Sequence, residues 1–170
     1  TKEMTRHELR DRFGMVLQDA WLFEGSIRDN IAYAQDNLPE EKIIAAARSA
    51  SVDSFIKTLP GGYDFELSTG AENISQGQRQ LLTIARAMAS DPEIMILDEA
   101  TSNVDTHTEQ LIQKALAKLM HGRTSFVIAH RLSTIRDADM ILYMEHGDIL
   151  EHGSHEELMA QHGKYEALYM

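Results

Sequence analysis

The chain has 170 residues, of which 43% are hydrophobic and 25% are charged, a balance that is ordinary for one globular domain. Its formal net charge of −11 argues against a nucleic-acid partner, because proteins that bind the phosphate backbone present clustered positive charge. Cysteine is absent, which excludes disulfides and thiolate metal sites, and the longest apolar runs are far shorter than the roughly 20 residues that span a bilayer.

The first segments predict a strand followed by an aromatic cluster. The run 13–18 predicts a short strand that ends at a polar residue, Gln18. The Trp-Leu-Phe sequence at 21–23 is too short for a helix and is followed by a glycine. Such a cluster either packs into the core of its own domain or forms a docking surface for a partner, and the sequence leaves both alternatives open.

Two short helices are predicted next. Pro39 and the two glutamates after it favour a helix start, and apolar residues continue the pattern at helical spacing. A second helix is predicted over 52–59, and it ends at the Pro-Gly-Gly turn that follows. These helices predict a small helical lobe that is inserted between the first strand and the rest of a sheet.

A longer amphipathic helix begins at Ser75. Ser75 and Gln78 have the spacing of a capping box, in which each side chain satisfies a backbone donor of the first turn, and this structural role explains both residues. It does not explain Gly77, since glycine in the first turn weakens a helix by up to about 1 kcal/mol. A glycine there permits close approach to the positive end of the helix, where an anion such as phosphate is the natural ligand.

The stretch from Ile94 to Asp105 reads I-M-I-L-D-E-A-T-S-N-V-D. Four apolar residues before two acids predict a strand that is buried on both faces and delivers Asp98 and Glu99 to its carboxyl end, where open α/β sheets bind ligands. Adjacent acids are costly to desolvate unless a metal, hydrogen bonds or a cation take up their charge. The alternative is that both acids simply open a surface loop after a core strand.

The remaining segments continue the alternation of helices and strands. An amphipathic helix is predicted over 106–120, and a second strand buried on both faces is predicted over 125–129. That strand ends at His130, although a single histidine at a strand end is more often structural than catalytic. Two further strands joined by a tight turn and a capped C-terminal helical stretch complete the pattern.

Taken together, these segments resemble the nucleotide-binding domain of ABC transporters over nearly the whole chain. Five motifs occur in the order of that family: the Q-loop in V-L-Q-D-A-W-L-F with Gln18, the signature in I-S-Q-G-Q, the Walker B strand in I-M-I-L-D-E, the D-loop in S-N-V-D, and the switch histidine in V-I-A-H-R-L-S-T. The resemblance implies an α/β fold of the P-loop NTPase (RecA-like) type, a parallel sheet with flanking helices. Within 1–170, the inserted helical lobe and the approach to the signature would occupy about 30–75, and the remainder would form the RecA-like core.

The resemblance also implies a role for each motif residue. Asp98 and Gln18 would hold Mg²⁺, Glu99 would orient and deprotonate the attacking water, and His130 would hydrogen-bond the γ-phosphate. The expected catalytic residues are therefore Glu99, His130 and Gln18. The residues that would contact ATP held mainly by the opposite subunit are Ser75, Gln76, Gly77, Gln78 and Asp105. The active unit would be a dimer of nucleotide-binding domains that is coupled to a transmembrane domain.

The chain departs from the family pattern at two places. None of its ten glycines belongs to a G-x-x-x-x-G-K-[ST] sequence, so the phosphate-cradling loop and its lysine are missing. We therefore expect an N-terminally truncated domain that binds ATP weakly and exposes an unpaired strand edge, through which it associates with another chain or rearranges. In addition, Thr69-Gly70-Ala71 with Glu72 displaced stands where many exporters have a glutamate, which weakens the expected communication with the transmembrane part.

The segments around the Q-loop and the tail G-D-I-L-E-H-G-S-H-E-E-L resemble lipid and multidrug exporters, whose ATPase is fused to a transmembrane domain at the cytoplasmic face of the cell membrane. The leading hypothesis is an ATP-binding and ATP-hydrolysing motor domain of such an exporter. The alternative is a catalytically inactive fragment that acts as a binding or interaction module. The intact Glu99 favours the motor for a full-length parent, and the missing lysine favours the module for the isolated chain.

Overall fold

The computed structural model describes residues 4–33, 35, 37–98, 104–129 and 132–169. The chain divides into two compact units, Thr1–Ile128 and Ala129–Met170, and each has a hydrophobic cluster of its own. Within the described ranges, no helix is both long enough and apolar enough to cross a membrane.

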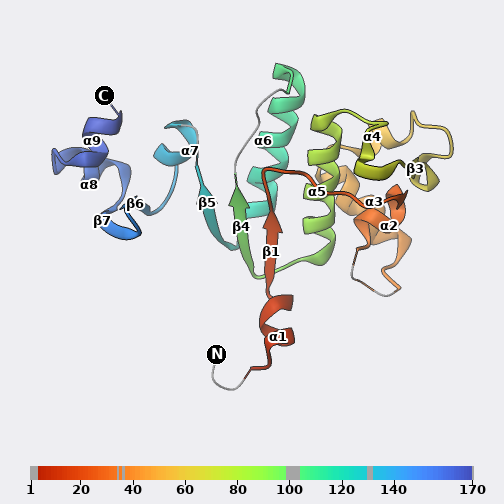
Figure 1. Ribbon diagram of the computed structural model, residues 1–170, viewed down its shortest axis with the longest axis horizontal. Coiled ribbons are helices and arrows are strands. Elements are labelled where there is room, and N and C mark those ends of the chain that lie inside the picture. The colour runs from red at the N-terminus through yellow and green to blue at the C-terminus, as the bar shows by residue number, and fades with distance from the viewer. Residues whose placement is uncertain (1–3, 34, 36, 99–103, 130–131, 170) are drawn as a thin grey trace. The chain divides into compact units, whose positions relative to one another are not determined.

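A three-stranded parallel sheet organises the first unit (Figure 1). Strand β4 (Ile94–Asp98) lies in the middle, between β1 (Phe13–Val16) and β5 (Thr124–Ile128). The β-branched and aromatic residues of these strands favour an extended, pleated surface. The predicted α/β class with a parallel sheet is confirmed.

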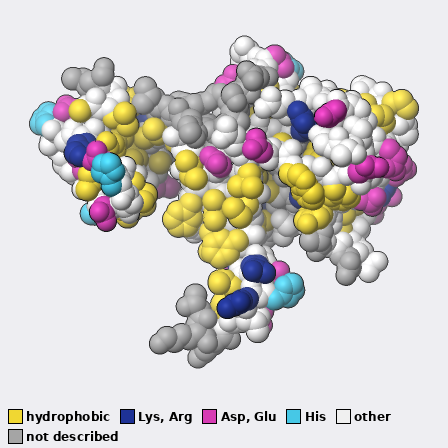
Figure 2. Space-filling view, in the orientation of Figure 1, with side chains coloured by type: hydrophobic (Ala, Val, Ile, Leu, Met, Phe, Trp, Pro, Cys, Tyr) yellow, Lys and Arg dark blue, Asp and Glu magenta, His cyan; other side chains and the backbone are white. Residues whose placement is uncertain are grey.

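The sheet of the first unit is covered on one face only, so the prediction that its strands are buried on both faces is wrong. Met95 and Leu97 are buried, whereas Ile96 is partly exposed and Phe126 and Ile128 are each 56% exposed. Figure 2 shows hydrophobic side chains gathered over this open face. The physical reason is that the helices of the shared core pack on the same face, and an apolar run by itself does not reveal how many faces are covered.

Two long helices cover the buried face. Helix α5 (Gln76–Ser90) and helix α6 (Thr106–Met120) pack against each other, and α5 also contacts β1. Both match the helices predicted from hydrophobic spacing. Their buried apolar residues are Leu81, Leu82, Ile84, Ala85 and Ala87 in α5, and Ile112, Ala115, Leu116 and Leu119 in α6.

Shorter elements make up the rest of the first unit. They are α1 (Arg6–Asp11), β2 (Gly25–Ser26) paired with β3 (Glu66–Leu67), α2 (Ile27–Ile31), α3 (Glu40–Ser49), α4 (Asp53–Ile56), and the 3-10 turns η1 (Gly62–Asp64) and η2 (Thr69–Ala71). The sequence analysis did not predict α1 and α2, because both are only one to two turns long. Helices α2 and α3 pack on α5 and share one hydrophobic cluster with the sheet, so a separate lobe at about 30–75 remains a prediction.

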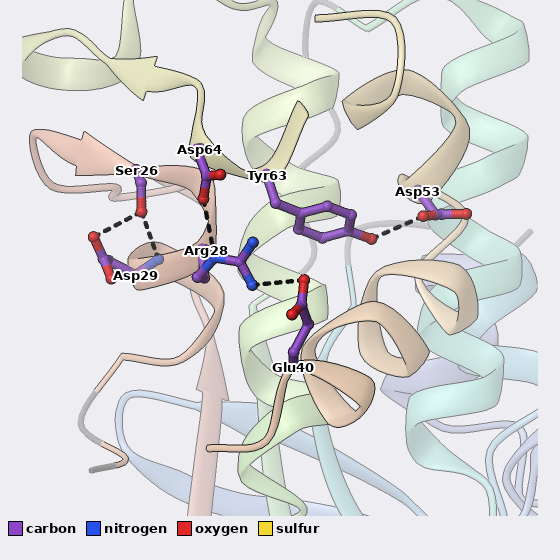
Figure 3. A network of polar contacts seen from close by, with 7 residues as sticks. All are labelled: Ser26, Arg28, Asp29, Glu40, Asp53, Tyr63 and Asp64. Carbon is purple, nitrogen blue, oxygen red and sulfur yellow. Dashed lines mark hydrogen bonds and ion pairs between the residues drawn. The ribbon is translucent and has the colours of Figure 1, made fainter. Parts of the chain in front are cut away.

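A polar network ties these short elements together on the surface (Figure 3). Arg28 of α2 donates through Nε to Asp64 at 3.0 Å and pairs through Nη1 with Glu40 of α3 at 3.1 Å. The hydroxyl of Tyr63 donates to Asp53 of α4 at 2.8 Å, and burial together with this bond raises the pKa of Tyr63. Since Asp64 and Glu40 are mostly exposed, each ion pair contributes on the order of 0–1 kcal/mol, and the network orients the helices more than it stabilises them.

The second unit is a hairpin followed by short helices. Its elements are α7 (Leu132–Arg136), β6 (Ile141–Glu145), β7 (Asp148–Gly153), α8 (His155–Ala160) and α9 (Lys164–Tyr169). The predicted turn between the strands and the predicted capping box at Ser154 are both present. Ile141, Leu158 and Tyr165 form its small core.

Gly77 lies where α5 meets α6. A Cβ atom added to this glycine would overlap with Cγ2 of Thr108 and would lie 3.1 Å from Cγ1 of Val104. The sequence analysis found no structural reason for a glycine in the first turn of this helix. The structure provides one, because α6 occupies the space that any side chain at this position would need.

We predict that Gly77→Ala lowers the stability of the protein, although alanine gains about 1 kcal/mol of helix propensity over glycine. The added methyl group would overlap with Thr108, and overpacking of a tight interface costs about 1–3 kcal/mol. Urea unfolding would measure the free energy of unfolding. Adding Thr108→Ser removes the overlapping methyl group and should restore most of the loss, whereas a Gly77→Ala protein more stable than the parent would contradict this packing role.

Candidate functional site

The carboxyl ends of the three parallel strands meet at one edge of the sheet. Val16 of β1 pairs with Leu97 of β4, and Asp98 of β4 pairs with Ile128 of β5. Gln18 follows the end of β1 by two residues, and Asp98 is the last residue of β4. The register therefore brings the predicted Q-loop residue and the first predicted acid to the same edge, where open parallel sheets bind ligands.

Asp98 belongs to the open face of the sheet. Side chains alternate along a strand, so Asp98 shares the face of Ile94 and Ile96, opposite the buried Met95 and Leu97. Its side chain is partly buried, and Gln18, which follows the neighbouring strand β1, is exposed. A ligand at this edge can therefore reach Asp98 from the face that the helices leave open.

The two remaining predicted catalytic residues, Glu99 and His130, lie outside the described residues. The strands that lead to them are described, because Asp98 directly precedes Glu99 and β5 ends at Ile128, two residues before His130. Both residues therefore follow strands whose carboxyl ends lie at the same edge of the sheet.

The donor set at this edge fits a magnesium ion that arrives with a nucleotide. Within the described ranges, no group of three or more His, Asp or Glu side chains could hold a metal ion. Mg²⁺ usually keeps several waters and is held by one or two carboxylates together with substrate phosphates. One carboxylate, Asp98, and the amide oxygen of Gln18 are donors of the type that such an ion accepts.

The capping box predicted at the start of α5 is confirmed. The hydroxyl of Ser75 accepts the N–H of Gln78 at 3.3 Å, and the side-chain oxygen of Gln78 accepts the N–H of Ser75 at 2.9 Å. Ser75 is exposed, Gln76 and Gln78 are partly exposed, and Gly77 is buried. The first N–H groups of a helix have no partner within it, so this helix start can still bind an anion.

Asp105 caps α6 beside that helix start. Its Oδ1 accepts the N–H of Thr108 at 3.0 Å, and this bond lowers the pKa of the Asp105 carboxyl. Val104, the residue before it, lies next to the position of Gly77, so helix packing brings the predicted D-loop segment to the signature segment. The described site residues thus form two groups. Strand pairing brings Gln18 and Asp98 together, and helix packing brings the start of α5 to the segment of Asp105.

The Trp-Leu-Phe cluster is buried only in part, and its role as a docking surface remains a prediction. Leu22 belongs to the core at 2% exposure, whereas Trp21 is 59% exposed and its ring packs edge-to-face with Tyr33 at 6.1 Å between centroids. The sequence analysis missed Arg86 of α5, whose Nη1 donates to the backbone oxygen of Trp21 at 3.0 Å. An arginine within the apolar pattern of a helix is the signal that could have revealed this contact, since its charge needs acceptors when buried.

Comparison with known proteins places the sequence in a family. Residues 1–102 match the family model described as ABC transporter. The chain is 54% identical over 162 residues to the fatty acid ABC transporter ATP-binding/permease protein of Mycobacterium bovis, a match that covers 95% of this chain and 26% of that protein. It is 49% identical over 168 residues to the ATP-dependent lipid A-core flippase of Desulfotalea psychrophila, which covers 99% of this chain and 29% of the flippase.

A solved structure gives the same result. A bacterial Atm1-family ABC exporter with ATP bound superposes with a TM-score of 0.87 at 40% sequence identity, covering 98% of this chain and 29% of that chain. The chain spans about a quarter of the length of the curated relatives that it matches. The family model covers more than half of the sequence, and the relatives and the solved structure agree with it. The chain belongs to the ABC transporter family.

Proposed function

We propose that this chain is part of the ATP-hydrolysing motor of an ABC exporter. The observation that carries the proposal is the strand register, which brings Gln18 and Asp98 to one edge of a parallel sheet in a member of the ABC transporter family. The exporter assignment is supported by the likeness to the ATP-bound exporter structure and by relatives that are named as permeases and a lipid flippase.

Each of the proposed catalytic and metal-binding residues has a chemistry that suits ATP hydrolysis. Asp98, with Gln18, would hold Mg²⁺, which neutralises charge on the phosphates when it is bound. Glu99 would orient the attacking water and accept its proton, because a carboxylate is a suitable general base. His130 would donate a hydrogen bond to the γ-phosphate as negative charge develops there.

The residues at the start of α5 would contact ATP bound to a second nucleotide-binding domain. Ser75 is exposed, and the N–H groups of Gln76 and Gly77 in the first turn of α5 have no partner within the helix, next to the segment of Asp105. Together with Gln76 and Gln78, they would contact the γ-phosphate of ATP held mainly by the partner domain. This arrangement requires a dimer.

This chain would lie at the cytoplasmic face of the cell membrane. Its partner there would be the transmembrane domain of the exporter. Relatives of this chain carry the name ATP-binding/permease protein, which joins both activities in one polypeptide. Trp21 to Phe23 and the helices over 39–59 would form the docking surface for that domain. Trp21 is exposed on this surface and packs against the exposed Tyr33. The transported compound would be selected by the transmembrane domain.

The competing function is a non-catalytic binding module. It is favoured by one sequence feature, the absence of a G-x-x-x-x-G-K-[ST] loop from these 170 residues. The acid expected to be lost from an inactive site, Glu99, is present. The two functions are separated by the experiments below.

Replacing Glu99 by glutamine in a full-length transporter that contains this chain should lower the rate of ATP hydrolysis by about 100-fold or more, because an amide keeps the shape but cannot accept the proton. Nucleotide binding should persist. His130→Ala should slow the same step. The matched control is Glu93→Gln, which changes an exposed acid just before β4, at its opposite end, and should leave the rate unchanged. A Glu99→Gln transporter that hydrolyses ATP within a few-fold of the parent would contradict the assignment.

The isolated chain should not bind Mg-ATP with micromolar affinity. It lacks the lysine and the run of backbone N–H groups that surround the β- and γ-phosphates in P-loop proteins. Titration calorimetry, with light scattering on the same sample to record its association state, would measure this. Micromolar binding by a monomer would show that the chain forms its nucleotide site in another way.

A photo-crosslinker at position 21 of the full-length transporter should react with the transmembrane domain, because Trp21 lies on the proposed docking surface. His121, an exposed residue at the end of α6, is the control position and should give no such product. Crosslinks from position 21 only to the nucleotide-binding domain would mean that the cluster belongs to the surface of its own domain.

A further inference from the structure

An arginine of α5 lies beneath an exposed group of aromatic rings. We call Trp21, Phe23 and Tyr33 the aromatic cluster, whose ring centroids are 5.7–6.2 Å apart. The guanidinium carbon of Arg86 lies 4.9 Å from the ring centroid of Tyr33 and 5.9 Å from that of Trp21. Both distances are within the range of a cation–π interaction.

All three nitrogens of the Arg86 guanidinium also donate hydrogen bonds. Nε donates to the backbone oxygen of Asn30 at 2.8 Å, Nη2 to the side-chain oxygen of Asn30 at 3.0 Å, and Nη1 to the backbone oxygen of Trp21 at 3.0 Å. The planar fork of an arginine can make these three bonds at once, whereas the ammonium of a lysine cannot reproduce their geometry. The guanidinium is partly buried, and this burial lowers the pKa of Arg86.

Asn30 connects Arg86 to Phe23. We call Arg86 and Asn30 together the clamp. This residue is fully buried, and its amide bonds both backbone groups of Phe23, accepting the N–H and donating to the oxygen, each at 3.0 Å. It also donates to the backbone oxygen of Ser26 at 3.0 Å. Arg86 and Asn30 together therefore fix the backbone of Trp21 and Phe23 to α5.

The clamp joins the two segments that are proposed to contact nucleotide. Arg86 lies about 15 Å along α5 from Gln76, at a rise of about 1.5 Å per residue, and the helix between them is largely buried. Trp21 follows Gln18 by three residues. Through α5 and the clamp, the signature segment is thus connected to the residues that follow the Q-loop glutamine.

We propose that Arg86 is a positioning residue that transmits movement of α5 and of the Gln18 segment to the aromatic cluster on the docking surface. This inference rests on the proposed function, because it assumes that nucleotide acts on both segments. The guanidinium is planar, each of its three nitrogens donates a hydrogen bond, and two of these bonds go to backbone oxygens, so a shift of α5 carries Trp21 with it. The role differs from catalysis, because the contacts of Arg86 within the described residues are to Asn30, Trp21 and Tyr33, and none of these is a proposed reacting group.

The first test uses the 170-residue chain, in which Trp21 is the only tryptophan. Arg86→Lys should red-shift the emission of Trp21 and raise its acrylamide quenching constant, because the ring loses the cation and the backbone bond that hold it. Tyr33→Leu changes an exposed residue on the other side of the same contact and should have a similar effect. The matched control is Arg28→Lys, which alters another guanidinium beside a ring, 6.0 Å from Tyr63, and should leave Trp21 unchanged.

The second test uses a full-length transporter in which every other tryptophan is replaced by phenylalanine. Adding Mg-ATP should change the quenching constant of Trp21 in the parent and in Arg28→Lys. In Arg86→Lys this change should be smaller by about fivefold or more, while Mg-ATP still binds in an equilibrium assay.

The outcomes separate the inference from the proposed function. An Arg86→Lys transporter whose Trp21 responds to Mg-ATP as the parent does would overturn the positioning role, and so would an equal loss in Arg28→Lys, which would indicate general loosening. A parent that binds Mg-ATP without any response at Trp21 would overturn the transmission. A parent that does not bind Mg-ATP would contradict the proposed function, while the first test would still decide whether Arg86 holds the aromatic cluster.

Discussion

The parallel pairing of β4 with both of its neighbours is the constraint on which the rest of this structure depends. Because the three strands run in the same direction, their carboxyl ends must meet at one edge, and the polar residues that follow them are brought together although they are far apart in the sequence. A shift of one residue in this register would move Asp98 to the face that packs on α5 and α6, where an ionised carboxylate is costly to bury. The burial of Met95 and Leu97 on that face therefore also fixes the place of the acid.

Helix α5 is the second determinant, because it contacts four other elements of the first unit. It packs against the sheet, against α6 and against α2 and α3, and eight of its residues are buried. A helix that is enclosed in this way moves as a rigid body, since any internal distortion would disturb several close-packed interfaces at once. Its two ends can then be linked mechanically, with the capped start at Ser75 and the guanidinium of Arg86 held at a fixed separation.

The sequence predicted those parts of the structure that are encoded by local patterns. Helices α5 and α6 were predicted nearly to the residue, because hydrophobic spacing and capping residues define their ends. The open face of the sheet was not, because Phe126 and Ile128 have the same apolar character whether or not a layer covers them. Asn30 and Arg86 were also missed, since their contact joins positions 56 residues apart and leaves no periodic signal.

The described site residues have structural roles that do not require a ligand. Ser75 and Asp105 cap helices, and Gly77 makes room for α6, so these interactions hold the segments in place before any phosphate arrives. A site whose backbone is already fixed loses less conformational entropy when it binds, and its donors need not reorganise during reaction. The capping role and the proposed binding role are therefore compatible at one residue: the Ser75 hydroxyl accepts from the helix with its oxygen and keeps its hydrogen to donate.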